Sequence, residues 1–249
     1  MVPEWEVTVL RKGYHMSKDV TLLKQLAAER AVEHVESGMV VGLGHGSTAI
    51  LAVRRLAELL QANRLSNIVC IPCSRQTESE ARELGIPLTT LEEHPEVDLT
   101  IDGADEVDPN LDLIKGGGGA LLREKIVAQA SRREMIIVDE TKLSPALGIK
   151  WPVPVEVIPF GWGSQAEFLK SLGATVNPRR ETGEILFKTD QGNLILDCNF
   201  GPIPEPALLA YELETRVGIV EHGMFLGLAS EVIVASREGI RHLRRDGKK

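Results

Sequence analysis

The regular alternation of helices with short apolar strands constrains the fold of this chain most strongly. Four apolar runs have the length and composition of buried strands, at 39–43, 67–71, 97–101 and 135–138. Four helical segments are predicted beside them, at 18–37, 48–61, 74–84 and from the glycine run 116–119 to residue 130. Such alternation predicts βαβ units, and hence an α/β fold in which helices cover both faces of a parallel sheet.

The pattern changes near residue 148, which predicts a second, smaller domain. An extended proline-rich stretch is followed by a helix, a two-stranded hairpin and another helix, predicted at 151–159, 164–172, 185–188 with 194–197, and 205–214. Two more apolar strands, at 223–228 and 231–235, are expected to return to the first domain. The predicted domains are therefore 18–147 with 220–249 and an inserted α+β domain at 148–219, after an N-terminal extension at 1–17. The basic tail at 241–249 is expected to be a solvated end.

Charge, aromatic content and cysteines narrow the function classes. The 249-residue chain has a net charge of -8 and only 4% aromatic residues, which weighs against nucleic-acid binding. No apolar run approaches the ~18 residues of a membrane span, and the N-terminus lacks the apolar core of a secretory signal. Cys70, Cys73 and Cys198 are an odd number, so we expect reduced thiols and a cytoplasmic protein. Cys70 and Cys73 have CxxC spacing, but no second CxxC or His pair completes a zinc site.

The first segment that can carry chemistry is GLGHGST at 42–48, between a predicted strand and helix. Glycines allow a ligand to approach the backbone closely, and Ser47 and Thr48 add hydroxyls beside the exposed N–H groups of a helix start. These groups favour an anion such as phosphate. The dinucleotide fingerprint fails, because Thr48 or Ala49 stands where its third glycine belongs. The alternative is an ordinary strand-to-helix turn in which Ser or Thr caps the helix.

The second segment is DGADEVD at 102–108, directly after a predicted buried strand. Open α/β sheets place ligands at the carboxyl ends of their strands. The carboxylates there could bind sugar hydroxyls, move protons or hold a metal, although the EF-hand pattern is not met. A solvated acidic turn is the alternative, and it suits Glu106 and Asp108 better than Asp102 and Asp105.

The third segment is KGGGGALLREK at 115–125. Four glycines before a helix form a candidate anion cradle with Lys115 at its edge. Glu124 has only apolar neighbours three and four residues away, so we expect a desolvated carboxyl with a raised pKa, suited to general-base work. The alternative for Glu124 is an inter-helix salt bridge. Arg123 and Lys125 are expected to point to solvent or to local partners.

Together the three segments suit proton abstraction beside a carbonyl on a phosphorylated sugar, with no need for a metal or nicotinamide motif. Eight of the 23 glycines fall in them, so the small glycine excess is local. Lysines 24, 115 and 142 offer a locally positive site on an acidic chain.

From about residue 18 onward the chain resembles type A ribose-5-phosphate isomerase. Five motifs carry the resemblance: GLGHGSTA at 42–49, DGADEVDPNLDLIKGGGGALLREKIVA at 102–128, DETK at 139–142, VPVEVIP at 153–159 and GNLILD at 192–197. The resemblance implies interconversion of ribose 5-phosphate and ribulose 5-phosphate without cofactor or metal, in the pentose phosphate pathway or Calvin cycle. It also implies a Rossmann-like domain with a smaller ferredoxin-like lid, and a homodimer or homotetramer.

The resemblance assigns roles by position. Glu124 matches the general base, which moves a proton between C2 and C1 through a cis-enediolate, and Lys115 would stabilise the enediolate oxygen. Asp102 and Asp105 match residues that hold sugar hydroxyls and assist ring opening and proton transfer. The remaining substrate-binding positions would be Lys24, His45, Gly46, Ser47, Thr48, Gly103, Ala104, Gly116, Gly117, Gly118 and Lys142. One departure is visible, since the family's usual Thr in GTGST is His45 here.

Two other classes remain open from the sequence. A fold relative such as an amino-sugar phosphate deaminase or a CoA-transferase also uses glycine-rich loops and a Glu. A non-catalytic sugar-phosphate-sensing module would normally carry a DNA-binding segment, and residues 1–17 are too short for a helix-turn-helix. For the isomerase we expect a small-molecule phosphosugar as the partner, with neither nucleic acid nor membrane involved.

Overall fold

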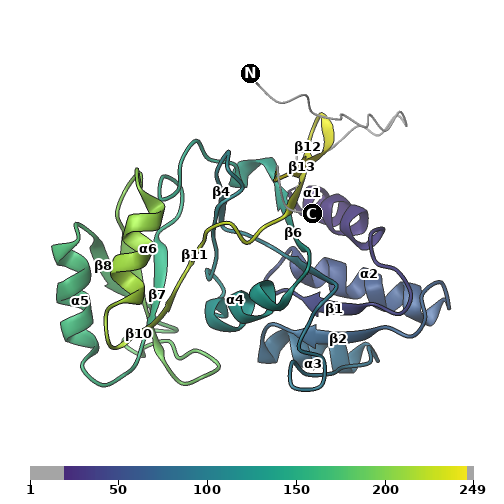
Figure 1. Cartoon of the computed structure of the whole chain (residues 1–249), viewed down its shortest axis with the longest axis horizontal. Coiled ribbons are helices and arrows are strands. Elements are labelled where there is room, and N and C mark those ends of the chain that lie inside the picture. Colours follow the sequence, from purple (N-terminus) through teal and green to yellow (C-terminus); the bar gives the residue numbers. More distant parts are fainter. Residues whose placement is uncertain (1–19, 246–249) are drawn as a thin grey trace. The chain divides into compact units, whose positions relative to one another are not determined.

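The computed structural model describes residues 20–245, which form two compact units (Figure 1). The first unit comprises residues 20–103, Ile126–Lys142 and 228–245, and the second comprises Ala104–Lys125 and Leu143–Gly227. The N-terminal extension expected at 1–17 and the end of the basic tail at 246–249 lie outside the described residues.

The first unit is built on a six-stranded sheet, which confirms the predicted α/β fold. Its strands in chain order are β1 (Val40–Leu43), β2 (Val69–Pro72), β3 (Leu99–Asp102), β6 (Glu134–Asp139), β12 (Glu231–Ser236) and β13 (Gly239–Arg244). The spatial order is β13-β12-β6-β3-β1-β2, and all neighbours are parallel except β12 and β13. The strand β13 corrects the expectation of a solvated tail. Every residue of β12 is buried, so its outer edge needs a pairing strand, and β13 supplies it.

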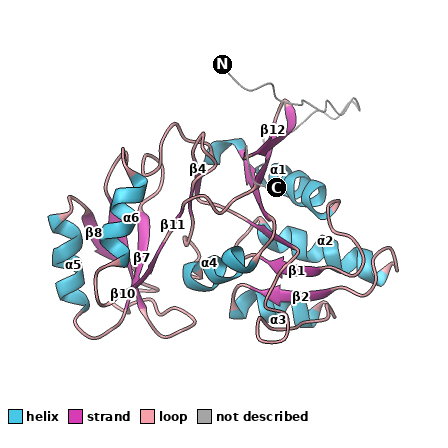
Figure 2. Ribbon diagram, in the orientation of Figure 1, coloured by secondary structure: helices cyan, strands magenta, loops and turns pink. Residues whose placement is uncertain are grey.

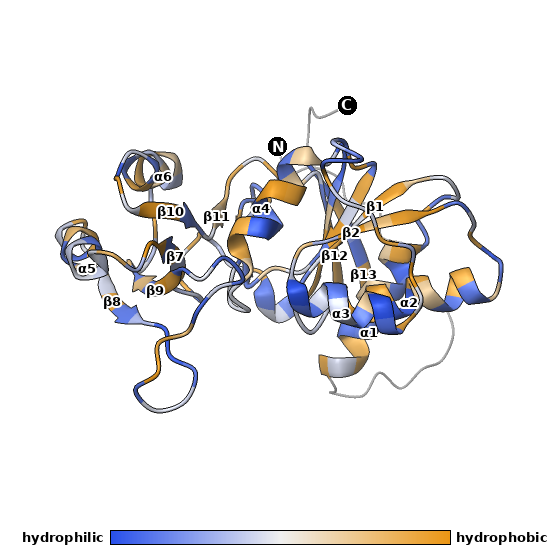
Figure 3. Cartoon of the chain, turned by 90° about the horizontal axis from the view of Figure 1, so that it is seen from below, coloured by the Kyte–Doolittle hydropathy of each residue, from blue (hydrophilic) through white to orange (hydrophobic). Residues whose placement is uncertain are grey.

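Helices cover both faces of this sheet. Successive strand residues point to opposite faces, so two neighbouring residues of β2 contact different helices. Cys70 of β2 belongs to the core formed with α1 (Val20–Val32) and α2 (Ala49–Gln61), whereas the next residue, Ile71, packs with Val127 of α4 (Leu121–Ala130). Figure 3 shows β1 and β2 as hydrophobic along most of their length, as strands buried on both faces must be. Each large apolar side chain buried here contributes about 1.5–3 kcal/mol.

The second unit contains a four-stranded antiparallel sheet with two helices on one face (Figure 2). Its elements are β7 (Val153–Val157), α5 (Trp162–Ser171), β8 (Thr175–Pro178), β9 (Leu194–Asn199), α6 (Pro206–Glu214) and β10 (Ile219–His222). The chain order β–α–β–β–α–β and the spatial order β10-β7-β9-β8 are those of a ferredoxin-like motif. Alternate residues of β7, at 153, 155 and 157, bury their side chains against α5 and α6.

The predicted hairpin between 185–188 and 194–197 is wrong. Residues 185–188 form no strand, and the segment 194–197 lies in β9, which pairs with β7 on one edge and β8 on the other. With both edges of β9 occupied, no backbone groups remain there for a third partner. The apolar run at 185–188 is short, and its sequence does not show that β7 and β8 take both edges of β9.

The two units divide the chain differently from the expected domains. A small sheet of β4 (Glu106–Val107), β5 (Leu113–Ile114) and β11 (Met224–Phe225) draws residues 104–125 into the second unit. Residues 143–147 join it too, since Ser144 donates its backbone N–H to the carbonyl of Val107 at 2.8 Å. Of the two strands expected to return to the first unit, only β12 does so, because β11 pairs with β5.

No helix among the described residues is long and apolar enough to cross a membrane. All three cysteines are buried and free of disulfides. Burial raises the pKa of the Cys70 thiol to about 12, so this thiol stays protonated and unreactive at neutral pH.

Candidate active site

The loop after β1 passes so close to β3 that only glycine fits at two positions. A Cβ added to Gly42 would lie 1.8 Å from Thr100 Oγ1, and one added to Gly44 would lie 2.2 Å from Asp102 Oδ1. Gly46 adopts a φ of +101°, which side-chain-bearing residues rarely adopt. The glycines therefore shape a turn from β1 into α2 with exposed backbone at its tip.

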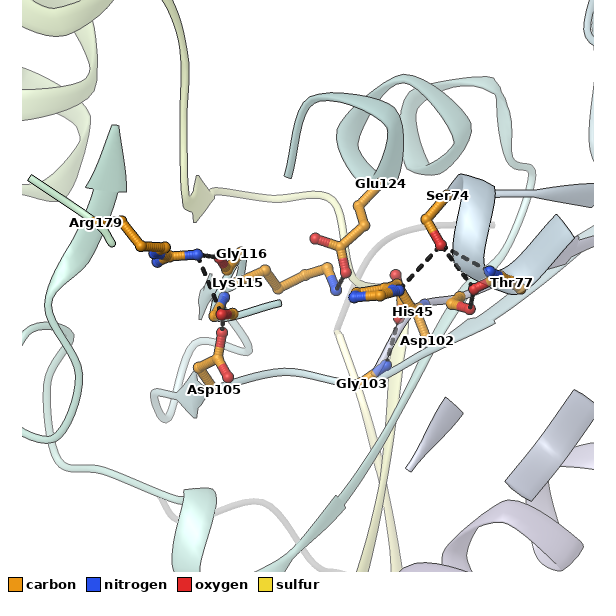
Figure 4. A network of polar contacts seen from close by, with 12 residues as sticks. His45, Ser74, Thr77, Asp102, Gly103, Asp105, Lys115, Gly116, Glu124 and Arg179 are labelled. Carbon is orange, nitrogen blue, oxygen red and sulfur yellow. Dashed lines mark hydrogen bonds and ion pairs between the residues drawn. The ribbon is translucent and has the colours of Figure 1, made fainter. Parts of the chain in front are cut away.

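Asp102 holds this loop in place. It is the last residue of β3 and is fully buried, and its Oδ1 accepts hydrogen bonds from the backbone N–H groups of His45 at 2.9 Å and Gly103 at 2.7 Å (Figure 4). The carboxylate predicted as a ligand of substrate is thus also the group that fixes the glycine loop in the first unit.

A chain of hydroxyl groups orients the His45 ring. Thr77 Oγ1 donates to the carbonyl of Gly44 at 3.0 Å, and Ser74 Oγ donates to Thr77 Oγ1 at 2.9 Å. Since the Ser74 hydrogen is committed to Thr77, His45 Nδ1 must carry the hydrogen in its 3.0 Å bond to Ser74 Oγ. Sequence reasoning missed Ser74 and Thr77. The available signal was the N-cap of α3 (Arg75–Glu83), where Ser74 Oγ accepts from Thr77 N.

Two predicted binding residues come together at the start of α2. Lys24, half-buried on α1, donates from Nζ to Ser47 Oγ at 2.9 Å. Thr48 occupies the N-cap position of α2 but makes no side-chain capping bond, which removes the support for a purely capping role. Lys142 is half-buried on the short 3₁₀ helix η1 (Glu140–Lys142), which follows β6 in the same unit.

In the second unit, Lys115 and Glu124 form a buried ion pair. Lys115 Nζ lies 2.9 Å from Glu124 Oε1, and the side chains are only 2% and 4% exposed (Figure 4). The Lys115 ammonium also lies 5.4 Å from the centre of the buried Phe225 ring, a cation–π distance. Glu124 is desolvated in the first turn of α4, as expected, but it does pair with a cation. That partner precedes the glycine run, so the bond is not the inter-helix salt bridge considered as the alternative.

The glycine run forms a turn that donates a hydrogen bond to Asp105. Gly119 N–H donates to the carbonyl of Gly116 at 3.0 Å, which closes the turn. Gly117 N–H donates to Asp105 Oδ2 at 2.7 Å, and a Cβ on Gly117 would lie 2.7 Å from the other carboxylate oxygen. Gly118 is exposed at the tip, and Gly103, Ala104 and Asp105 are half-buried.

Two expectations about neighbouring charges are wrong. Glu106 is fully buried rather than in a solvated turn, and it accepts four backbone N–H groups from residues 148–151. Lys125 is also buried, and it donates to the carboxylate of Glu221 and to the carbonyl of His222, 96 and 97 residues away. Burial lowers the pKa of Lys125, an effect that Glu221 partly offsets.

Asp108 does not lie in a solvated turn either. It is only 8% exposed, and its Oδ1 accepts from the backbone N–H groups of Asn110 and Asp112, both at 2.9 Å. Burial raises the pKa of this carboxyl. Among the described residues, no group of three or more His, Cys, Asp or Glu side chains is arranged to hold a metal ion.

These features are those of an α/β enzyme with candidate acid–base groups. The first unit presents a glycine loop and lysine at the carboxyl ends of parallel strands, and the second presents a buried Lys–Glu pair beside a glycine turn.

Comparisons with known proteins give the family. A family model described as ribose 5-phosphate isomerase A (phosphoriboisomerase A) matches residues 69–239. Ribose-5-phosphate isomerase A of Chloroflexus aurantiacus is 58% identical over 88% of this chain and 92% of its own length. The chain belongs to the ribose 5-phosphate isomerase A family.

Solved structures agree with this assignment. A D-ribose-5-phosphate isomerase in complex with phospho-erythronic acid has a TM-score of 0.89 and 41% identity, over 91% of this chain and 100% of that one. The ribose 5-phosphate isomerase of Plasmodium falciparum has a TM-score of 0.88 and 42% identity over the same shares.

Proposed function

We propose that this chain interconverts D-ribose 5-phosphate and D-ribulose 5-phosphate through a cis-enediolate, without a cofactor. The buried pair of Lys115 and Glu124 is the observation that carries the proposal, because it joins a base and a cation in one desolvated place. The substrate, ribose 5-phosphate, is inferred from membership of the ribose 5-phosphate isomerase A family.

The proposed chemistry follows the movement of one negative charge. Glu124 starts as a carboxylate stabilised by the Lys115 ammonium at 2.9 Å. It removes the proton from C2 of the open-chain aldose, and the electron pair moves onto the C1 oxygen as the enediolate forms. Protonated Glu124 no longer needs the cation, so Lys115 can stabilise the new oxyanion instead. A proton then moves from the C2 hydroxyl to the C1 oxygen, so that the negative charge passes to the C2 oxygen. Return of the carbon-bound proton from Glu124 to C1 leaves C2 as the ketone carbonyl and restores the ion pair.

We assign the phosphate to the loop at 45–48 together with Lys24 and Lys142. The N–H groups at the start of α2 offer an anion site, and the Lys24–Ser47 contact places a cation beside them. In the proposal Asp102 and Asp105 hold sugar hydroxyls and assist ring opening and proton transfer. The backbone at 103–104 and 116–118 lines the remainder.

His45 replaces the threonine usual in the family, and we propose that its ring contacts the phosphate. Ser74 holds the ring through Nδ1, and in the proposal Nε2 donates to the phosphate when the imidazole is protonated. The His45→Thr variant should then show a weaker pH dependence of KM between about pH 5.5 and 7.5, around the free histidine pKa. An unchanged profile would remove this contact from the proposal.

The experiment that tests the proposal is ketopentose formation from ribose 5-phosphate by the purified wild-type chain, with and without EDTA. We expect equal turnover in both conditions. Loss of turnover in EDTA would contradict the metal-free mechanism. Turnover of glucosamine 6-phosphate or CoA esters instead would replace the proposal with a deaminase or CoA-transferase. We further propose a cytoplasmic homodimer or homotetramer, which light scattering on the purified chain can test.

A further inference from the structure

We propose that Arg179 is a positioning residue, which sets the orientation of the 116–119 turn and through it the carboxylate of Asp105. The inference rests on the proposed function, in which Asp105 handles the sugar hydroxyls. Arg179 lies just after β8, outside every motif that indicated the site.

The Arg179 guanidinium donates hydrogen bonds to two backbone carbonyls of the 116–119 turn. Its Nη1 donates to the carbonyl of Gly116 at 2.8 Å and to that of Gly117 at 3.1 Å (Figure 4). These carbonyls belong to two successive peptide groups. A single side-chain nitrogen therefore restrains the rotation of both peptides.

Planar peptide geometry converts this contact into a direction for the N–H groups. In a trans peptide the C=O and N–H bonds point in opposite directions, and no described peptide is cis. Because the carbonyl of Gly116 points at Arg179, the N–H of Gly117 must point away from it, and it meets Asp105 Oδ2 at 2.7 Å. By the same rule the N–H of Gly118 points away from Arg179. That peptide lies at the exposed tip of the turn, where an anion could accept its hydrogen bond.

A run of four glycines needs such a restraint, because its peptides rotate with little steric hindrance. The closing bond of the turn fixes the carbonyl of Gly116 but leaves the peptide between Gly117 and Gly118 free to flip. With the second contact from Nη1, a flip would break a charge-assisted hydrogen bond.

Arg179 is itself held rigidly enough to act as a reference point. Its Nε and Nη2 both donate to the carboxylate of Asp197 on β9, and its guanidinium lies 5.8 Å from the Phe187 ring. Its backbone N–H donates to the carbonyl of Ile195, and its carbonyl accepts from Phe187 N–H. The side chain is only 14% exposed.

The adjacent Arg180 provides a matched control. Its side chain is 41% exposed and pairs with Glu184 four residues away. It has the same charge and occupies the same segment, but it bonds no residue of the glycine turn among its described contacts.

The test compares Arg179→Ala and Arg179→Lys with Arg180→Ala in the isomerase assay. We expect kcat/KM to fall by about 10- to 100-fold for Arg179→Ala, since a displacement of about 1 Å at a reacting group can cost that much. Arg179→Lys should lie between, because one ammonium cannot serve Asp197 and the two carbonyls together. Arg180→Ala should match the wild type. Equal activity of the two alanine variants would overturn the proposal.

Chemical rescue separates positioning from general destabilisation. Guanidinium ion at about 50 mM, far below the molar range that unfolds proteins, should restore Arg179→Ala several-fold, while urea at the same concentration should not. Adding Asp105→Ala should make the loss from Arg179→Ala largely disappear, because the residue it positions is gone. Absence of rescue, or fully additive losses, would contradict the role. If Arg179→Ala does not fold, Arg179→Lys and its double variant with Asp105→Ala decide the question.

Binding distinguishes a failure of this inference from a failure of the proposed function. Should the wild type lack isomerase activity, calorimetric titration with phospho-erythronic acid compares the same variants. Weaker binding by Arg179→Ala than by Arg180→Ala would support the positioning role, and equal binding would overturn it.

Discussion

The Glu106→Gln substitution should destabilise the second unit although it keeps the number of heavy atoms and almost the whole volume of the side chain. Glu106 is fully buried, and each carboxylate oxygen accepts two backbone N–H groups: Oε1 from Ile149 and Lys150 at 3.2 and 3.1 Å, and Oε2 from Gly148 and Trp151, both at 3.1 Å. In glutamine one oxygen becomes an NH₂ group. Two backbone donors then face another donor.

An orphaned buried donor costs about 1–3 kcal/mol. Residues 149 and 150 are exposed, so water can replace part of the loss there, and we expect a total near 2–4 kcal/mol. At about 2–4 °C per kcal/mol this lowers the midpoint of thermal unfolding by roughly 4–16 °C.

The assay is thermal unfolding followed by circular dichroism, with Glu184→Gln as the control. The Glu184 side chain is 94% exposed and forms only a surface ion pair, so its loss should shift the midpoint by little. If both variants unfold within about a degree of the wild type, Glu106 does not anchor residues 148–151 in the way its hydrogen bonds indicate.

Three further predictions follow from other contacts. Lys24→Met should raise KM about tenfold with kcat little changed, because phosphate binding is the same in ground and transition states, and an unaltered KM would exclude Lys24 from the phosphate site. Gly117→Ala should lower kcat/KM at least about tenfold, because its Cβ would lie 2.7 Å from a carboxylate oxygen of Asp105. The control Gly163→Ala, which has open space around its Cβ, should keep the wild-type kcat/KM, and equal kinetics of the two variants would refute the steric argument. The hydrogen bond with His242 and the nearby Arg133 lower the pKa of Glu231 from 4.5 to about 2, so its stabilising contribution is complete above pH 4.5 and is lost as pH falls toward 2. Urea unfolding of Glu231→Gln should lose that acid dependence, and an identical pH profile would show that the pair contributes nothing.

The sequence predicted the parallel unit well, because its strands are short apolar runs and two of its helices, α2 and α3, each have one clearly apolar face. The strand β8 and the pairing of β9 escaped prediction. Register in an antiparallel sheet depends on which edges are already occupied, and only the assembled sheet shows that both edges of β9 are used.

The site was predictable where function leaves a pattern of residue types. The glycines and carboxylates of residues 42–48 and 102–119 stand out, and helical spacing marked Glu124 as a desolvated carboxyl. Arg179 did not stand out, since Arg179 and Arg180 are adjacent and chemically identical in the sequence. Only the three-dimensional contacts assign one to the glycine turn and the other to the surface.

Lys125 shows that the sequence alone does not identify buried charged residues. A lysine in a helix normally points to solvent, and its partner Glu221 is 96 residues away. Glu106 and Asp108 likewise look like surface residues until the backbone N–H groups around them are known.

The central claim is that Glu124 is the general base, and hydrogen exchange at C2 tests it most directly. Ribose 5-phosphate incubated in D₂O with the wild type should exchange its C2 hydrogen and form ketopentose. Glu124→Gln keeps the shape of the side chain but cannot accept the proton, so both exchange and turnover should fall by at least about 100-fold. Exchange or turnover at the wild-type rate in Glu124→Gln would contradict the account.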